Sequence, residues 1–257
     1  MKLKDFLLLV LLTLGALLVE GYHPWAEDAA LYLPGVEKIL NPELFPFNAQ
    51  FFESHAHLTF FPNFIAASVR TSHLPLEVVL FSWQGTSIFL FLLACRQLIS
   101  RCLPDEKARW AGVGLIAALL TLPVAGTALY IMDQYLNPRN LVAFAAIFAL
   151  VKVIDEKYFQ AALFLAFAAA IHPLMSVFIL SYCVVLLCIT QFDLRYAGLA
   201  WLLPFGISFD PPPPAYHQVA LLHSYFYLLR WQWYEWLGAV ASELFICSAL
   251  RSGTNKM

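Results

Sequence analysis

The apolar stretch FLLLVLLTLGALLV, residues 6–19, decides the fold class of this chain. It contains no charged residue, and with its flanks it approaches the roughly 20 apolar residues that a helix needs to cross a bilayer. Lys2 and Lys4 precede it, as in a secretory signal peptide, but no small-residue cleavage site follows it and many other apolar segments do. We therefore expect an uncleaved first transmembrane helix.

The composition of the whole 257-residue chain agrees with this first segment. Hydrophobic residues make up 61% and charged residues 12%, whereas soluble domains have about 45–50% and about 25%. A soluble protein of this size cannot bury so much apolar surface, so a soluble enzyme and a disordered chain are excluded. The formal net charge of -2 excludes a nucleic-acid partner, since it supplies no basic field for a phosphate backbone. The composition predicts an integral membrane protein whose partners include membrane lipids.

Further apolar segments predict an all-α polytopic transmembrane helix bundle of about seven or eight spans in one domain, residues 1–257. His172-Pro173 separates the fifth span from the sixth, because a proline ends the helix before it. Gln84, Thr86 and Ser87 in the second span are suited to hydrogen bonds between helices. After the first, the expected spans are 78–95, 111–132, 141–154, 158–171, 174–192, 196–209 and 236–250.

The basic residues predict the orientation of the bundle. With the N-terminus in the cytoplasm, eleven of the 15 lysines and arginines fall on the inner side. The outer side holds only Lys38, Arg70, Arg139 and Arg230. All seven histidines also fall on the outer side or at its edge. We expect a multi-pass protein with a cytoplasmic N-terminus, and the short turns favour a bacterial inner membrane.

The first extracytoplasmic loop, residues 20–76, concentrates polar groups at the outer face. Asp28 is placed to begin a short helix that Asn41-Pro42 ends, and a second amphipathic stretch covers 59–69. Such helices lie in the plane of the interface. They would hold the acidic pair Glu27 and Asp28 at the membrane surface, where a lipid head group sits.

The second extracytoplasmic segment, residues 210–234, begins with four consecutive prolines, which predict a stiff spacer. An aromatic stretch follows that includes Trp231, Trp233 and Trp236. An interfacial aromatic belt is one interpretation of it, and a stacking surface for a sugar ring is the other.

This order of parts resembles the membrane glycosyltransferases of the type C (GT-C) fold, which use polyprenyl-phosphate-linked sugars. The resemblance is carried by Glu27 and Asp28 in AEDAALYLPGVEKIL, residues 26–40, and covers roughly residues 1–240. The turn YLNPRNL, residues 135–141, and the His172-Pro173 turn support it. It implies a hexosyltransferase that moves a sugar from a polyprenyl-phosphate donor to an acceptor at the extracytoplasmic face, and the chain looks like a truncated bacterial member.

The resemblance also implies roles for individual residues. Asp28 would act as the base toward the acceptor hydroxyl, with Glu27 as its neighbour or substitute. The lipid phosphate leaves as an anion, so cations should stand near it. Arg139 and Arg230 are the outer-face candidates, because arginine binds phosphate in a fork, and His172 is a third.

Glu53, His55 and His57 form an E-x-H-x-H pattern in the first outer loop. In an extended segment the three side chains share one face, and together with Asp28 they would bind a divalent metal ion. On a helix, residues two apart splay by about 200°, which argues against a shared ion. We take substrate hydrogen bonding by His55 and His57 as the main interpretation and a metal ion as the alternative.

Two other classes of function stay open. A transporter or flippase for a lipid or small molecule needs ionisable groups deep in the spans, and the mid-span positions are apolar apart from Glu243. A non-catalytic membrane protein is the second, because residues 237–257 look like an aberrant or truncated end. The gathering of acids and histidines at the outer edge favours the enzyme.

Overall fold

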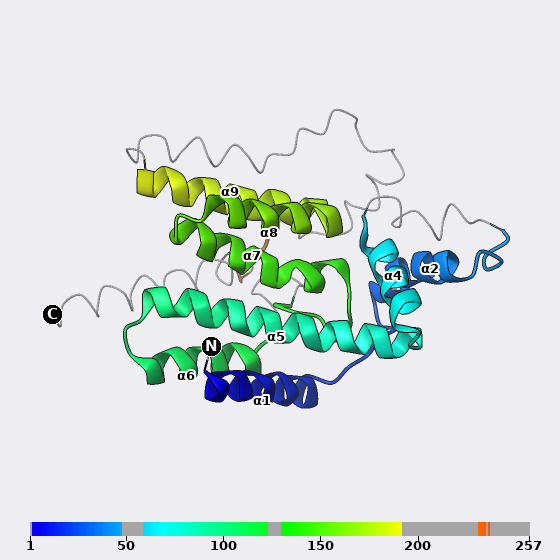
Figure 1. Cartoon of the computed structure of the whole chain (residues 1–257), viewed down its shortest axis with the longest axis horizontal. Coiled ribbons are helices and arrows are strands. Elements are labelled where there is room, and N and C mark those ends of the chain that lie inside the picture. The colour runs from blue at the N-terminus through cyan, green and yellow to red at the C-terminus, as the bar shows by residue number, and fades with distance from the viewer. Residues whose placement is uncertain (1, 48–58, 123–129, 192–230, 235, 237–257) are drawn as a thin grey trace. The chain divides into compact units, whose positions relative to one another are not determined.

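The computed structural model describes residues 2–47, 59–122, 130–191, 231–234 and 236. The chain divides into two compact units, Met1–Leu120 with Met132–Gly206, and Thr121–Ile131 with Ile207–Met257. The first unit is all-helical in its described elements, which confirms the predicted all-α class for this part (Figure 1). Its helices are α1 (Leu3–Glu20), α2 (Ala29–Leu40), α4 (Phe61–Ser72), α5 (Leu76–Cys102), α6 (Glu106–Ala118), α7 (Pro138–Ile154), α8 (Tyr158–Ile171) and α9 (Pro173–Gln191).

Helix α5 is the one described helix that is both long and apolar enough to cross a membrane, with 27 residues. Helix α8 and the Pro173–Leu187 part of α9 are apolar but shorter. Large apolar side chains also face outward, such as Leu11 on α1, 63% exposed, and Phe159 on α8, 78% exposed. These features point to association with a membrane, while the number of spans stays a prediction.

Five of the expected spans correspond to helices α1, α5, α7, α8 and α9, and α8 has the predicted bounds. The break between α8 and α9 falls at His172-Pro173 as predicted.

The third expected span, 111–132, is wrong as one helix, because α6 ends at Ala118. The Met132 N–H donates to the Leu120 carbonyl at 2.9 Å, so the chain has already turned. The sequence Leu122-Pro123 explains this, since a residue before proline disfavours the helical conformation. The seventh expected span, and the eighth apart from Trp236, lie outside the described residues.

The two short helices predicted in the first outer loop are present as α2 and α4. Helix α2 begins directly after Asp28, and its C-cap is Asn41. Helix α4 ends at Ser72, and the left-handed backbone of its C-cap His73 (φ 57) turns the chain into Leu74-Pro75 and the start of α5. Both helices have an apolar side, which packs α2 against α4 and α4 against α5.

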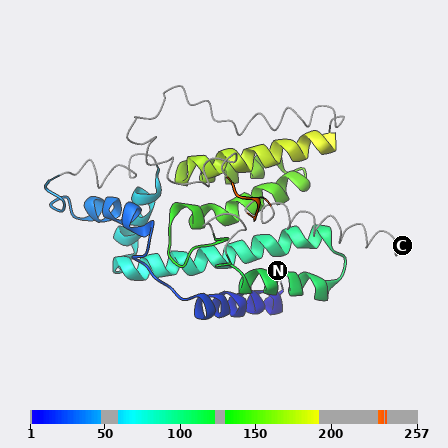
Figure 2. The same cartoon turned by 180° about the vertical axis from the view of Figure 1, so that it is seen from behind.

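Helix α7 lies between α5 on one side and α8 and α9 on the other, as both views show (Figures 1 and 2). Helices α1 and α6 pack on the remaining side of α5. One apolar core lies among α2, α4, α5, α7, α8 and α9 and includes Phe61, Leu80 and Leu141. The other lies among α1, α5 and α6 around Leu9 and Leu92. This packing places the loop after α1 beside the turn that precedes α7.

Candidate functional site

A polar cluster forms where the loop after α1 meets the turn before α7. The His23 N–H donates to the Gln134 carbonyl at 2.8 Å, and the Asp28 N–H donates to the Tyr135 hydroxyl at 3.3 Å. The Gln134 side chain donates back to the Glu20 carbonyl at the end of α1. These bonds hold the acidic pair of the first loop against a segment more than 100 residues further along the chain.

The turn before α7 is held by buried amide side chains. Asn137 caps α7 by accepting from the Asn140 N–H at 2.8 Å, and Pro138 follows at the first helical position. The Asn140 amide donates to the carbonyls of Asp133 and Tyr135, each at 2.9 Å, and accepts from the Asp133 N–H at 3.0 Å. Gln84 of α5 donates to the Asp133 carbonyl at 2.8 Å. The Gln84 Oε1 also accepts from the Asn140 amide of α7 at 3.3 Å, which confirms the predicted interhelical role of Gln84. Both bonds fix the turn to α5.

Arg139 forms an ion pair with Asp133 inside this turn. The Asp133 side chain is 3% exposed and that of Arg139 is 19% exposed, and Asn137 also donates to the Asp133 carboxylate. The positive charge of Arg139 is therefore partly balanced within the protein. Only its Nη2 is used in this pair, so within the described part of the chain the other N–H donors of the guanidinium are available to a ligand.

The acidic pair sits at a bend in the backbone. Glu27 has a left-handed conformation (φ 45), which for a residue other than glycine costs on the order of 1 kcal/mol. The Tyr135 hydroxyl donates to Glu27 Oε2 at 3.5 Å. Asp28 occupies the N-cap position of α2, but its side chain makes no capping hydrogen bond. Its exposed carboxylate therefore stabilises α2 at most through the helix dipole and is open to another role.

Two tyrosines beside the acidic pair have raised pKa values. The pKa of Tyr135 lies well above its ordinary value of 10.0, because of burial first and then the charge of Asp133. Its hydroxyl therefore keeps the proton that it donates to Glu27. The pKa of Tyr32 on α2 is raised by burial and by Asp28, and lowered by Arg139. The charges of Asp28 and Arg139 thus have opposite effects on the pKa of the same side chain, Tyr32.

His172 lies between α8 and α9, at the same end of α7 as Arg139. Its Nδ1 accepts from the Met175 N–H at 3.2 Å, so the ring caps the N-terminus of α9. Burial lowers the pKa of His172, and the charge of Arg139 lowers it further. With Nδ1 accepting, the proton of the neutral ring is on Nε2, which can donate to a ligand.

Four predicted site residues, Glu27, Asp28, Arg139 and His172, are thus brought to one end of the helices. Arg230, Glu53, His55 and His57 lie outside the described residues. Among the residues that the structure describes, no group of three or more His, Cys, Asp or Glu is arranged to hold a metal ion. Trp231 and Trp236, in the second unit, have ring centroids 5.3 Å apart.

Sequence reasoning missed Tyr135 and the roles of Asp133 and Asn140. The run DQYLNPRN, residues 133–140, is polar enough to mark a turn, but nothing local shows which chain segment it meets. Tyr135 is 3% exposed and carries both contacts to the acidic pair. No local signal in the sequence identifies this contact, because its partners lie 107 and 108 residues away in the chain.

No family model, curated protein or solved structure matches this chain. The assignment of the polar cluster as a candidate functional site therefore depends on its geometry alone.

Proposed function

We propose that this chain is a membrane glycosyltransferase that moves a sugar from a polyprenyl-phosphate donor to an acceptor at the extracytoplasmic membrane face. The observation that carries the proposal is the hydrogen bond between the Asp28 N–H and the Tyr135 hydroxyl, which places the exposed Asp28 carboxylate at the turn that leads into Arg139. Transfer of a sugar from a phosphate leaving group requires a base for the acceptor hydroxyl and a cation for the departing phosphate in the same site.

In this reaction Asp28 accepts the proton of the acceptor hydroxyl as the new bond to the sugar C1 forms. Glu27, oriented by the Tyr135 hydroxyl, is the neighbouring carboxylate. The bond from C1 to the phosphate oxygen breaks, and the polyprenyl phosphate leaves as an anion. The free N–H donors of Arg139 and the Nε2–H of His172 bind that anion.

The membrane setting supports a lipid-linked donor. Apolar side chains of α1 and α8 face outward, so a polyprenyl chain can lie along the protein in the bilayer. The acidic pair directly precedes helix α2, and an amphipathic helix of this kind lies in the plane of the membrane interface. The phosphate of a lipid-linked donor lies at the same level of the membrane.

The test is a transfer assay with the full chain in liposomes. Undecaprenyl-phosphate-linked glucose and mannose serve as donors, membrane extract supplies acceptors, and mass spectrometry follows the release of polyprenyl phosphate. We expect Asp28→Asn to lower the rate by about 10²–10³-fold, in the range of general-base catalysis. Glu43→Gln is the matched control, since it removes an exposed carboxylate from the same loop. Full turnover by Asp28→Asn, or no transfer by the unmodified chain, would overturn the proposal.

A further inference from the structure

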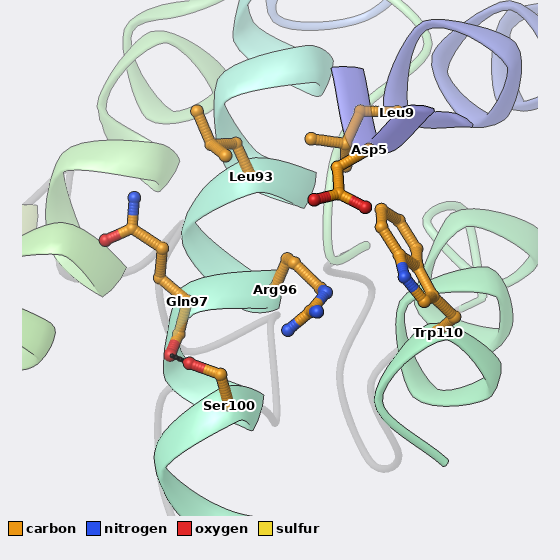
Figure 3. Close-up of a pocket in the computed structure, with 7 residues that line it drawn as sticks. All are labelled: Asp5, Leu9, Leu93, Arg96, Gln97, Ser100 and Trp110. Atoms are coloured by element: carbon orange, nitrogen blue, oxygen red, sulfur yellow. Dashed lines mark hydrogen bonds between the residues drawn. The ribbon is translucent and has the colours of Figure 1, made fainter. Parts of the chain in front are cut away.

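Two neighbouring cavities lie at the other end of α1 and α5, away from the polar cluster. The larger is about 680 Å³ and lies at the N-termini of α1 and α6. The smaller is about 260 Å³ and shares Asp5, Arg96 and Trp110 with it. Figure 3 shows the Asp5 carboxylate, the Arg96 guanidinium and the Trp110 ring directed into the same space between α1, α5 and α6.

Arg96 is held at the junction of the two cavities. Its guanidinium lies over the Trp110 ring, 5.0 Å from the centroid, and its Nη2 donates to Glu106 Oε1 at 2.6 Å. Its Nε has no hydrogen-bond partner among the described residues. Because Glu106 engages a single nitrogen, most of the N–H donors of Arg96 are unused.

The larger cavity carries an excess of positive charge. Its charged lining residues are Lys2, Lys4, Arg96, Lys107, Asp5 and Glu106. Glu106 is already engaged by Arg96 and Arg109 and accepts from the Trp110 Nε1 at 2.9 Å. The three lysines form no ion pair within the described part of the chain. Four cations, Lys2 and Lys4 at the start of α1, Arg96 of α5 and Lys107 of α6, therefore share this space with two carboxylates, and the excess of positive charge favours a phosphate.

The smaller cavity has a different character. Leu9 and Leu93 form its apolar wall, and Gln97 and Ser100 are the polar groups on α5 (Figure 3). A ligand that occupies both cavities must be amphipathic, with an anionic part near the lysines and an apolar part beside the leucines. A phospholipid has this form, and a free phosphate ion does not.

We propose that these two cavities bind an anionic phospholipid, with its phosphate diester between Arg96 and the lysines. The glycerol end and the first acyl carbons lie beside Leu93. Trp110 lines both cavities, and tryptophan favours the membrane interface, which is the level at which a phospholipid head group lies. The distribution of basic residues predicts that this end of the bundle faces the cytoplasm, where anionic lipid head groups attract them. The proposal does not depend on the glycosyltransferase chemistry.

The test uses the full chain in detergent, titrated with short-chain phosphatidylglycerol and followed by native mass spectrometry. We expect saturable binding that phosphatidylcholine does not match. The variant Lys2→Gln/Lys4→Gln/Lys107→Gln should bind on the order of 100-fold more weakly, since each lysine contributes about tenfold or somewhat less to the attraction of an anionic lipid. These three side chains are exposed, so their loss leaves the fold intact. Arg96→Gln should weaken binding as well.

Lys157→Gln is the matched control, because it removes an exposed lysine of the predicted cytoplasmic side that lies outside both cavities. Undiminished binding by the triple variant, or an equal loss in Lys157→Gln, would overturn the site. A second arm adds inorganic phosphate at millimolar concentration. Full displacement of phosphatidylglycerol by inorganic phosphate would show a simple anion site and overturn the lipid assignment.

Discussion

The Asp28 N–H and the Tyr135 hydroxyl, 107 residues apart in the chain, form a hydrogen bond of 3.3 Å. The same hydroxyl donates to Glu27 at 3.5 Å. Tyr135 thus accepts from the backbone of one acidic residue and donates to the side chain of the other. The ring of Tyr135 is buried in the core that includes residues of α7, so the packing of that core fixes the hydroxyl that contacts the acidic pair.

Removal of this hydroxyl should affect the acidic pair more than the fold. We expect Tyr135→Phe to lower the free energy of unfolding by about 1 kcal/mol, the net value of a typical hydrogen bond. Transfer activity should fall about tenfold, because Glu27 loses its orienting donor. A double-mutant cycle with Glu27→Gln separates positioning from stability. If the two substitutions lower the transfer rate independently, Tyr135 does not act through Glu27.

The Asp133–Arg139 pair should be important for stability because Asp133 is 3% exposed. Arg139→Gln leaves a buried carboxylate without its cation, and we expect a loss of about 3–5 kcal/mol in chemical unfolding in micelles. Asp133→Asn added to Arg139→Gln should recover part of this loss. Arg101→Gln is the comparison, since its partner Asp155 is 21% exposed, and about 1 kcal/mol is expected. Similar losses in the two arginine variants would contradict the burial argument.

The His172 cap predicts a dependence of stability on pH. Burial and Arg139 place the pKa of the folded state below the ordinary value of 6.5. A lowered folded-state pKa means that its contribution to stability is complete above about pH 6.5 and is lost as the pH falls through the folded pKa. Protonation of Nδ1 also removes the acceptor for the Met175 N–H.

The measurement for His172 is the midpoint of thermal unfolding between pH 7.5 and pH 5. We expect the unmodified chain to lose stability across this window. His172→Asn keeps a side-chain oxygen at the cap but removes the titrating group, so it should lose less. An identical pH dependence in the two proteins would rule out His172 as its source.

The predicted orientation can be tested with single cysteines. Cys102, at the end of α5, is exposed and lies on the predicted cytoplasmic side. With the other four of the five cysteines replaced by serine, a membrane-impermeant maleimide should label Cys102 only after cells are permeabilised. Ser72→Cys, on the predicted outer side in a cysteine-free chain, should be labelled in intact cells. The reverse pattern would invert the topology.

The sequence by itself was sufficient for most of the local structure. Apolar runs bounded by polar or proline-containing turns predicted α1, α5, α7, α8 and α9, because these signals act within a few residues. Asn41-Pro42 predicted the end of α2 for the same reason. The error in the third span arose where hydropathy continues past Ala118, since apolar character alone does not show where a helix stops.

Only the tertiary structure decided the composition of the candidate site. Asp28 and Tyr135 are separated in the chain by α2, α4, α5 and α6, and their contact depends on how α5 and α7 pack. The role of Tyr135 and the burial of Asp133 follow from that packing. Hydropathy and spacing describe a residue's neighbours along the chain, whereas a site assembled from separate segments depends on contacts between helices. The sequence therefore determined which polar residues were available, and the packing of the helices determined which of them meet.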